Sequence, residues 1–297
     1  MKLFVASVIC SALTLFCARS SQGQTANQTV PVNDPRPLAA ASDRIEKLSG
    51  LPVNYEDGPY VNAADLQDVT SKVLTPSQIG AAGPNFHVIV PRGGPLSAVI
   101  TVDPTTGGLG TLSAVQAAAE AFVNNQASTY GQLFSVGQVN GCVFISPSKL
   151  KNIVGSLQPI TPVFSANISF PQEKRTGYGT LKLILQSVLE ATGSKVGIAS
   201  APLKAFAETN VTIGANNEDA RTVLTRLLQA VTLGGGSGVS VSSPAMSYRL
   251  LYDFNLKLYE LSIKILNGAI VLFSPSQPLP SGQTPTSTSP FFTRDHP

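Results

Sequence analysis

The chain has 297 residues, of which 12% are charged and 43% hydrophobic, with a formal net charge of +3. This composition excludes a disordered chain, because disorder requires low hydrophobicity and high net charge. The small net charge gives no reason to expect nucleic acid as a partner. The 2 histidines are too few for a histidine-rich metal cluster. The length is enough for about two domains.

The first 23 residues have the pattern of a secretory signal peptide. One cation, Lys2, precedes an apolar run from Leu3 to Cys17, and small polar residues follow. The run is shorter than the roughly 20 residues that cross a bilayer as a helix. We therefore expect cleavage after Gly23, a periplasmic or secreted chain, and no stable membrane span once the signal is removed.

Three further segments are poor in apolar groups or interrupted by proline. Residues 24–34 are polar, and residues 274–297 are rich in serine, threonine and proline. Both are expected to be loose, and the second to be a disordered tail. Prolines recur within residues 147–162, which are predicted to be the linker between two domains.

The pattern is clearest in residues 163–273, the predicted second domain. Apolar residues from Leu181 to Leu189 recur at helical spacing, with Thr180 as a candidate start and Gly193 as a candidate end. The other expected elements are strands at 164–170, 195–199 and 211–214, a helix over 217–231 capped by Asn216 or Asn217, and a closing hairpin over 248–265.

Residues 35–146, the predicted first domain, repeat this order loosely. The expected elements are helices over 38–48 and 112–123, strands over 52–55 and 96–102, and a hairpin over 132–146 that turns at Asn140-Gly141. An insertion over 56–95 holds two extra strands, near Val69 and at 86–90. The predicted class is therefore α+β, with two similar small domains that each contain a small sheet and two packed helices.

This order of elements resembles the secretin and TonB short N-terminal domain. The resemblance rests on Thr180–Gly193, Val211–Ile213, Asn217–Leu228 and Tyr248–Ile265. It covers the second domain, and it extends to the first only by order of elements. Members of that family are periplasmic adaptor modules that contact other proteins and carry no catalytic residues. The plug and barrel strands that usually follow such modules are not recognisable here.

The resemblance implies a non-enzymatic protein-binding module of the bacterial cell envelope, with an envelope protein as its partner. We expect no catalytic residue, no cofactor and no metal site. The predicted docking surface is the edge of the closing hairpin, at Tyr248, Tyr252 and Tyr259, because an unpaired strand edge accepts a strand from a partner.

Several side chains suggest other chemistry but lack supporting motifs. Two acidic pairs, Glu56-Asp57 and Asp65 with Asp68, are most simply solvated loop acids. His87 falls in an expected strand with no evident partner. After signal removal Cys142 is the only thiol, and its neighbours indicate a small residue in a strand rather than a nucleophile.

Two rival functions stay open. A cell-wall or carbohydrate-binding protein would present exposed tyrosines such as Tyr55, Tyr60 and Tyr248 in a groove. A hydrolase would place two of the loop carboxylates in one cleft. The charges of the two domains have opposite signs: residues 24–150 hold 6 cations against 9 anions, and residues 151–273 hold 11 against 7. This difference would help the domains pack or steer a charged partner.

Overall fold

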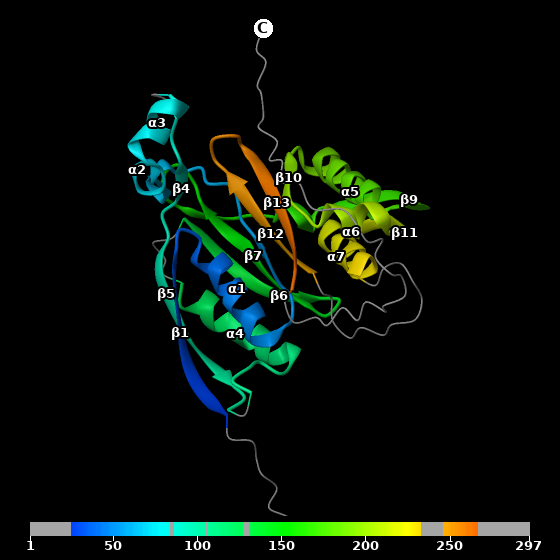
Figure 1. Ribbon diagram of the computed structural model, residues 1–297, viewed down its shortest axis with the longest axis horizontal. Helices are drawn as coiled ribbons and strands as arrows, with labels where there is room; N and C mark the ends of the chain where they lie inside the picture. The colour runs from blue at the N-terminus through cyan, green and yellow to red at the C-terminus, as the bar shows by residue number, and fades with distance from the viewer. Residues whose placement is uncertain (1–24, 84–85, 105, 127–130, 233–245, 267–297) are drawn as a thin grey trace, which may run out of the picture.

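The computed structural model describes residues 25–83, 86–104, 106–126, 131–232 and 246–266 (Figure 1). The predicted signal peptide, the C-terminal tail and the glycine-rich loop before the closing hairpin lie outside these residues. The described chain mixes helices and strands, so the predicted α+β class is confirmed. None of the described helices is long and apolar enough to cross a membrane.

In the first half of the fold, residues 25–160, two helices lie between a two-stranded ribbon and part of a central sheet. The ribbon strands are antiparallel partners over their whole length. The elements are β1 (Ala26–Asp34), α1 (Pro37–Ser49), β2 (Val53–Glu56), β5 (Gly94–Val102), α4 (Leu112–Asn124), β6 (Gln132–Val139) and β7 (Cys142–Lys151).

The second half, residues 161–266, has the same order of elements. Its helices again lie between an antiparallel ribbon and the central sheet. The elements are β9 (Asn167–Thr176), α5 (Gly177–Thr192), β10 (Val196–Ser200), β11 (Asn210–Asp219), α7 (Ala220–Thr232), β12 (Met246–Asp253) and β13 (Leu258–Ile265).

Shorter elements connect these repeated parts. The insertion after β2 holds the expected pair of extra strands, which are antiparallel, together with short helices. These elements are a 3-10 turn (Ala63–Asp65), β3 (Leu66–Asp68), α2 (Thr70–Val73), α3 (Pro76–Ala82) and β4 (Ile89–Pro91). Between the halves lie β8 (Leu157–Pro159) and a 3-10 turn (Val163–Ser165), and α6 (Leu203–Glu208) follows β10.

One central sheet runs through both halves in the order β10-β13-β12-β2-β7-β6, with β8 paired to β7. In each half the strand after the first helix pairs in parallel with the second strand of a hairpin, β2 with β7 and β10 with β13. The halves are joined where β12 runs parallel to β2. Because the sheet is continuous, two separate domains are not confirmed.

Each face of this sheet carries its own core. Along β7, Cys142 and Phe144 belong to the core of the second half, while Val143 and Ile145 belong to that of the first. Successive side chains of a strand point to opposite faces, so the two helical layers cover opposite faces of one sheet. Figure 1 shows the resulting series of layers, from the β1–β5 ribbon through the sheet to the β9–β11 ribbon.

Local sequence explains the ends of the main elements. Helices α1 and α5 end at Gly50 and Gly193, which have φ of 68° and 72°, in the left-handed region that suits glycine. The β6–β7 hairpin turns at Asn140 and Gly141, both with positive φ, as the Asn-Gly signal predicts. The helix start predicted at Thr180 is wrong by one turn, because Thr176 is the cap and accepts a hydrogen bond from the Gly179 amide.

Three other predictions need correction. Residues 26–34 are not loose but form β1, because Val30 and Val32 are buried against the first core. The predicted linker, 147–162, is in part strand, since β7 continues to Lys151 and pairs with β8. The caps predicted at Asn216 and Asn217 are part of β11, and Asp219 instead accepts a hydrogen bond from the Thr222 amide at the start of α7.

Candidate functional site

The first acidic pair is buried at the junction of the two halves, so the prediction of solvated loop acids is wrong for these residues. Glu56 is 0% exposed and Asp57 is 1% exposed. Glu56 accepts hydrogen bonds from Arg221 at 2.7 and 2.9 Å and from the Tyr248 hydroxyl at 2.7 Å. Asp57 pairs with Arg36 at 2.7 Å. These contacts engage three of the four carboxylate oxygens, and the Tyr55 hydroxyl donates to the fourth, as in a structural ion-pair network.

Two arginines complete this network from opposite halves. Arg36 donates to Asp57 and to the Tyr252 carbonyl; burial opposes its charge, but the Asp57 carboxylate beside it holds its pKa above the ordinary value. Burial likewise opposes the charge of Arg221, but Glu56 raises its pKa above the ordinary value. Both guanidinium groups are therefore permanently charged and neutralised locally.

The second acidic pair also has partners. Asp65 is 7% exposed and lies 3.3 Å from the Lys151 ammonium. Asp68 accepts hydrogen bonds from Thr70 and lies 2.6 Å from His87 Nδ1, and these hydrogen bonds lower its pKa to about 2. His87 is thus an exposed residue with a carboxylate partner, contrary to the prediction. Among the described residues, no group of three His, Cys, Asp or Glu side chains could hold a metal ion.

Cys142 lies at the start of β7, 1% exposed, within the second core. Burial in apolar surroundings raises the pKa of its thiol to about 12. A thiolate is required for nucleophilic attack, so this residue is held in its unreactive form.

We therefore expect a chain that begins at Gln24, in which Cys142 is the only thiol, to resist a thiol reagent at pH 8 while folded. The same chain in concentrated urea should react completely within minutes. Absorbance of the thiol-exchange product measures both reactions. Rapid reaction of the folded chain would contradict the assignment of Cys142 as an inert core residue.

The tyrosines proposed for stacking on a glycan are not exposed. Tyr55, Tyr60 and Tyr248 are 2%, 8% and 0% exposed. Burial first, and then the neighbouring carboxylates, raise the pKa of each hydroxyl well above its ordinary value. Their hydroxyls donate to Asp57 or Glu56, so their role is to complete the network between the halves.

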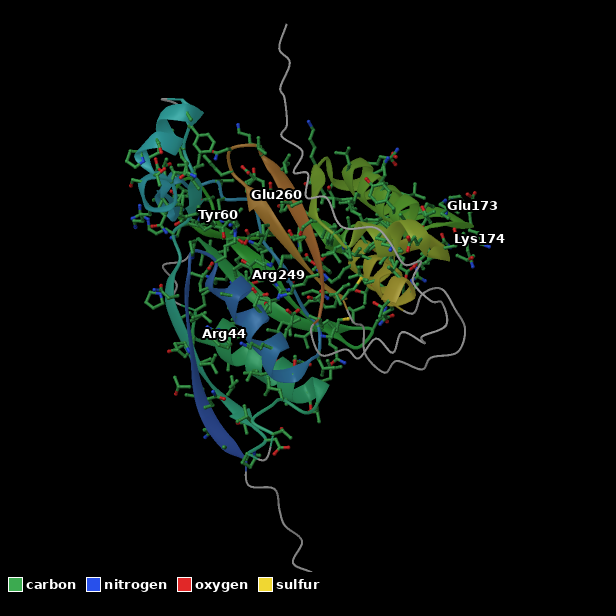
Figure 2. All side chains as sticks on the ribbon, in the orientation of Figure 1. Arg44, Tyr60, Glu173, Lys174, Arg249 and Glu260 are labelled. Carbon is green, nitrogen blue, oxygen red and sulfur yellow. The ribbon has the colours of Figure 1, made fainter. Side chains whose placement is uncertain are left out.

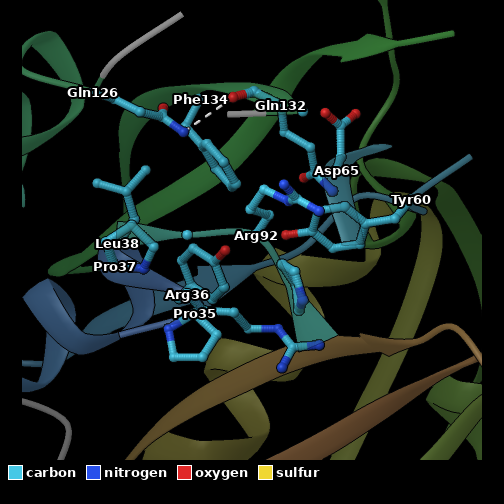
Figure 3. A pocket seen from close by; sticks show the side chains of 14 residues that line it. Pro35, Arg36, Pro37, Leu38, Tyr60, Asp65, Arg92, Gln126, Gln132 and Phe134 are labelled. Carbon is cyan, nitrogen blue, oxygen red and sulfur yellow. Dashed lines mark hydrogen bonds between the residues drawn. The ribbon is translucent and has the colours of Figure 1, made fainter. Parts of the chain in front are cut away.

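A small cavity adjoins this network between β1–α1, the insertion and β6 (Figure 3). Arg36, Tyr60, Asp65 and Arg92 line it, and Gln126 donates a hydrogen bond to the Gln132 carbonyl at its rim. Its volume is about 20 Å³. A cavity of this size has room for about one water molecule, so it is too small for a sugar or a nucleotide.

The docking edge predicted on the closing hairpin is wrong. Strand β12 lies between β13 and β2, and β13 lies between β12 and β10. Tyr248 is fully buried, Tyr259 is 4% exposed, and Tyr252 packs edge-on against Tyr259 with ring centroids 5.1 Å apart. The hairpin is interior because strands from both halves extend the sheet on its two sides.

An open groove lies instead at the end of the sheet, between α5 and β10. We call it the α5–β10 groove, and its volume is about 810 Å³. Tyr178 and Leu189 are 38% and 39% exposed, and Val196 and Ile198 of β10 are half-buried. The lining is apolar with cations and no carboxylate: Arg175, Tyr178, Gly179, Lys182, Leu183, Leu185, Gln186, Leu189, Lys195, Val196 and Ile198.

Sequence reasoning missed this groove because it placed Leu189 on the buried face of the helix. One signal was present: α5 carries apolar side chains over more than one face, since Leu183 lies outside the helical spacing of the buried residues Leu181, Ile184, Leu185 and Val188. An additional apolar face on a helix requires a further packing partner.

A second ionic cluster joins the halves where α1 meets β12 and β13. Arg249 of β12 donates to Asp43 at 2.7 Å and to Glu46 at 2.8 Å, and Lys264 of β13 pairs with the same two carboxylates. Figure 2 shows Arg249 near the centre of the molecule, where α1 and β12 meet. Over the two clusters together, all four acids come from the first half and three of the four cations from the second, so the opposite charges of the halves contribute to their packing.

The stability that this cluster contributes depends on pH through the ionisation of Asp43. Partial burial opposes its ionisation, but Arg249 and Lys264 hold its pKa below the ordinary value of 3.8. A carboxylate whose pKa is lower in the folded state than in the unfolded state stabilises the fold at pH values above its unfolded-state pKa. This stabilisation is lost as the pH falls through the folded-state pKa.

We expect Asp43→Asn to lower the free energy of unfolding at pH 7 by only about 0.5–1 kcal/mol, because the carboxylate is 56% exposed and screened by solvent. The difference from the wild type should shrink below about pH 4. Urea titrations at pH 7 and pH 3 measure both values, and Glu208→Gln in α6 is the control. An equal deficit at both pH values would contradict the electrostatic origin.

Comparison with known proteins gave no match to any family model, to any curated protein or to any solved structure.

Proposed function

We propose that the chain is a non-enzymatic protein-binding module that acts in the bacterial cell envelope. The observation that carries the proposal is the α5–β10 groove, which combines exposed apolar side chains with the terminal strand of the central sheet. The resemblance of the second half to secretin and TonB short N-terminal domains supports it. Export rests on the pattern of the first 23 residues.

The groove has the properties of a strand-acceptor site. The Lys195 carbonyl accepts a hydrogen bond from the Tyr259 amide of β13. The backbone N–H and C=O groups of successive strand residues point to opposite sides of the strand. Because those of Lys195 point toward β13, those of Val196 and Ile198 point away from it. An added strand would pair with these groups while its side chains contact α5.

The rival functions have weaker support in the arrangement of the same residues. Glycan stacking needs exposed aromatic rings, whereas the tyrosines considered for it are buried. Hydrolysis needs two carboxylates in one cleft, whereas Glu56 and Asp57 are occupied by internal partners.

The proposal is tested by crosslinking in the native host. A photoreactive phenylalanine analogue replaces Tyr178 in the groove or, as the control, Ile153, which is 79% exposed in the β7–β8 turn. We expect irradiation to join one protein to the Tyr178 variant and none to the Ile153 variant. Absence of an adduct at Tyr178, or equal adducts at both positions, would contradict protein binding at this groove.

A further inference from the structure

The two halves offer an internal comparison for the α5–β10 groove. Helices α1 and α5 both end at a left-handed glycine, whose amide donates to the Glu46 carbonyl in α1 and to the Leu189 carbonyl in α5, each at 2.8 Å. The next strand begins three residues after each glycine, and it pairs in parallel with the second strand of a hairpin, β2 with β7 and β10 with β13. Glu46 thus corresponds to Leu189, and β2 corresponds to β10.

In the first half the place that corresponds to the groove is filled. Strand β12 runs parallel to β2, with Arg249 opposite Tyr55. The Arg249 side chain reaches over α1 to Asp43 and Glu46. Val53 and Tyr55 of β2, beside this strand, are 0% and 2% exposed.

In the second half the corresponding place is open. No strand in the described part of the chain pairs with β10 on the side away from β13. Val196 and Ile198, which occupy the positions of Val53 and Tyr55, remain half-buried. Within the described residues, the fold thus contains one occupied and one unoccupied copy of the same helix–strand acceptor.

We infer that the α5–β10 groove binds one extended segment of a partner protein in parallel with β10, as β12 is bound by β2. This inference rests on the proposed function and adds to it the direction and the chemistry of the bound segment.

The lining of the groove defines that chemistry. In α5, Leu189 occupies the position of Glu46 in α1, and Gln186 occupies the position of Asp43. These two residues replace the carboxylates that pair with Arg249, so the bound segment should place an apolar residue in the position of Arg249. Cations lie at both ends of the groove: Lys195 precedes β10, and Lys182 lies about two turns before Leu189 in α5. The segment should therefore carry carboxylates on both sides of its apolar centre.

Two segments of the chain itself fit this chemistry less well. Residues 267–273 are mostly apolar and contain no charged residue, and β6, the other terminal strand of the sheet, contains none either. Neither segment would neutralise the cations of the groove. Both are nevertheless distinguishable outcomes of the test.

The test uses the full chain from Gln24 and a fluorescent peptide, Asp-Glu-Val-Thr-Leu-Thr-Val-Asp-Glu, with a matched peptide that carries lysine at the four acidic positions. We expect the acidic peptide to bind at least tenfold more tightly than the basic one, and added salt to weaken it. Lys182→Glu and Leu189→Asp should each weaken it at least tenfold. The controls Lys72→Glu and Ile153→Asp, which change exposed residues elsewhere, should not.

The direction is read by NMR with a spin label on either end of the acidic peptide. A parallel segment brings its N-terminal label near the amide of Lys195 and its C-terminal label near that of Ser200. The reverse pattern, equal binding of the two peptides, or no binding of either would overturn this inference. In each case the proposed function still stands if the Tyr178 crosslink captures a partner, and it falls with the inference if no adduct forms.

The remaining outcomes concern the occupant. Tighter binding of a peptide with the sequence of residues 267–273 would assign the groove to the C-terminal segment of the same chain. Sedimentation of a dimer that Leu189→Asp dissociates would assign it to a second copy. Either result would overturn the assignment to a partner protein.

Discussion

Replacement of Glu56 by alanine should lower the free energy of unfolding by about 3–5 kcal/mol, because it leaves a buried charge without its partner. Arg221, with a side chain only 12% exposed, would lose both of its hydrogen bonds to the carboxylate. The Tyr248 hydroxyl, which is fully buried, would lose its acceptor at the same time. Urea denaturation followed by circular dichroism measures the loss.

Two variants make this result specific. Glu56→Ala combined with Arg221→Met should recover part of the loss, because the second substitution removes the uncompensated charge. Glu173→Ala breaks an exposed ion pair with Arg175, in which the glutamate side chain is 60% exposed, and it should cost less than about 0.5 kcal/mol. A loss below about 1 kcal/mol for Glu56→Ala alone would show that the ion pair does not stabilise the junction.

Local elements of the fold were predictable because each depends on residues close together in sequence. The spacing of apolar residues identifies α1, α4, α5 and α7, and Gly50 and Gly193 mark two helix ends. The positive φ values of the Asn-Gly turn follow from the conformational freedom of glycine and the tolerance of asparagine. These signals also explain why the order of elements in the two halves was recognisable.

Strand order across the halves was not predictable, because a continuous sheet depends on pairing between segments about 190 residues apart. The pairing of β12 with β2 places Arg249 opposite Tyr55. A hairpin considered by itself has two free edges, so the sequence suggested an edge at Tyr248–Ile265. One of the two terminal strands of the sheet, β10, is only five residues long and is followed by a short helix.

The acidic pairs were misjudged for a related reason. Glu56 is the last residue of a strand of only four residues, and Asp57 precedes a glycine, which is typical of an exposed turn. Their partners are 165 residues away at Arg221 and 21 residues away at Arg36. Burial of such a pair depends on these distant cations, and no local pattern reports them.

Separation of the two halves provides the sharpest experimental distinction between one folding unit and two domains. We expect the fragments 24–160 and 161–273, expressed separately, to lack the cooperative unfolding transition of the full chain. Each fragment would lose part of its core: Phe144 and Cys142 of β7 pack in the second half, and Leu251 of β12 packs against the first.

The two ionic clusters between the halves further destabilise the separate fragments, because each fragment would also retain unpaired charges. The first fragment would keep Glu56 without Arg221, and the second would keep Arg249 without Glu46. Mixing equal amounts of the fragments should restore the transition, since the β12–β2 pairing and both ionic clusters can re-form between chains. Urea titration of each fragment and of the mixture measures these outcomes. A sharp transition in either fragment alone, near the midpoint of the full chain, would show that the halves fold independently and that the continuous sheet is only a contact between two domains.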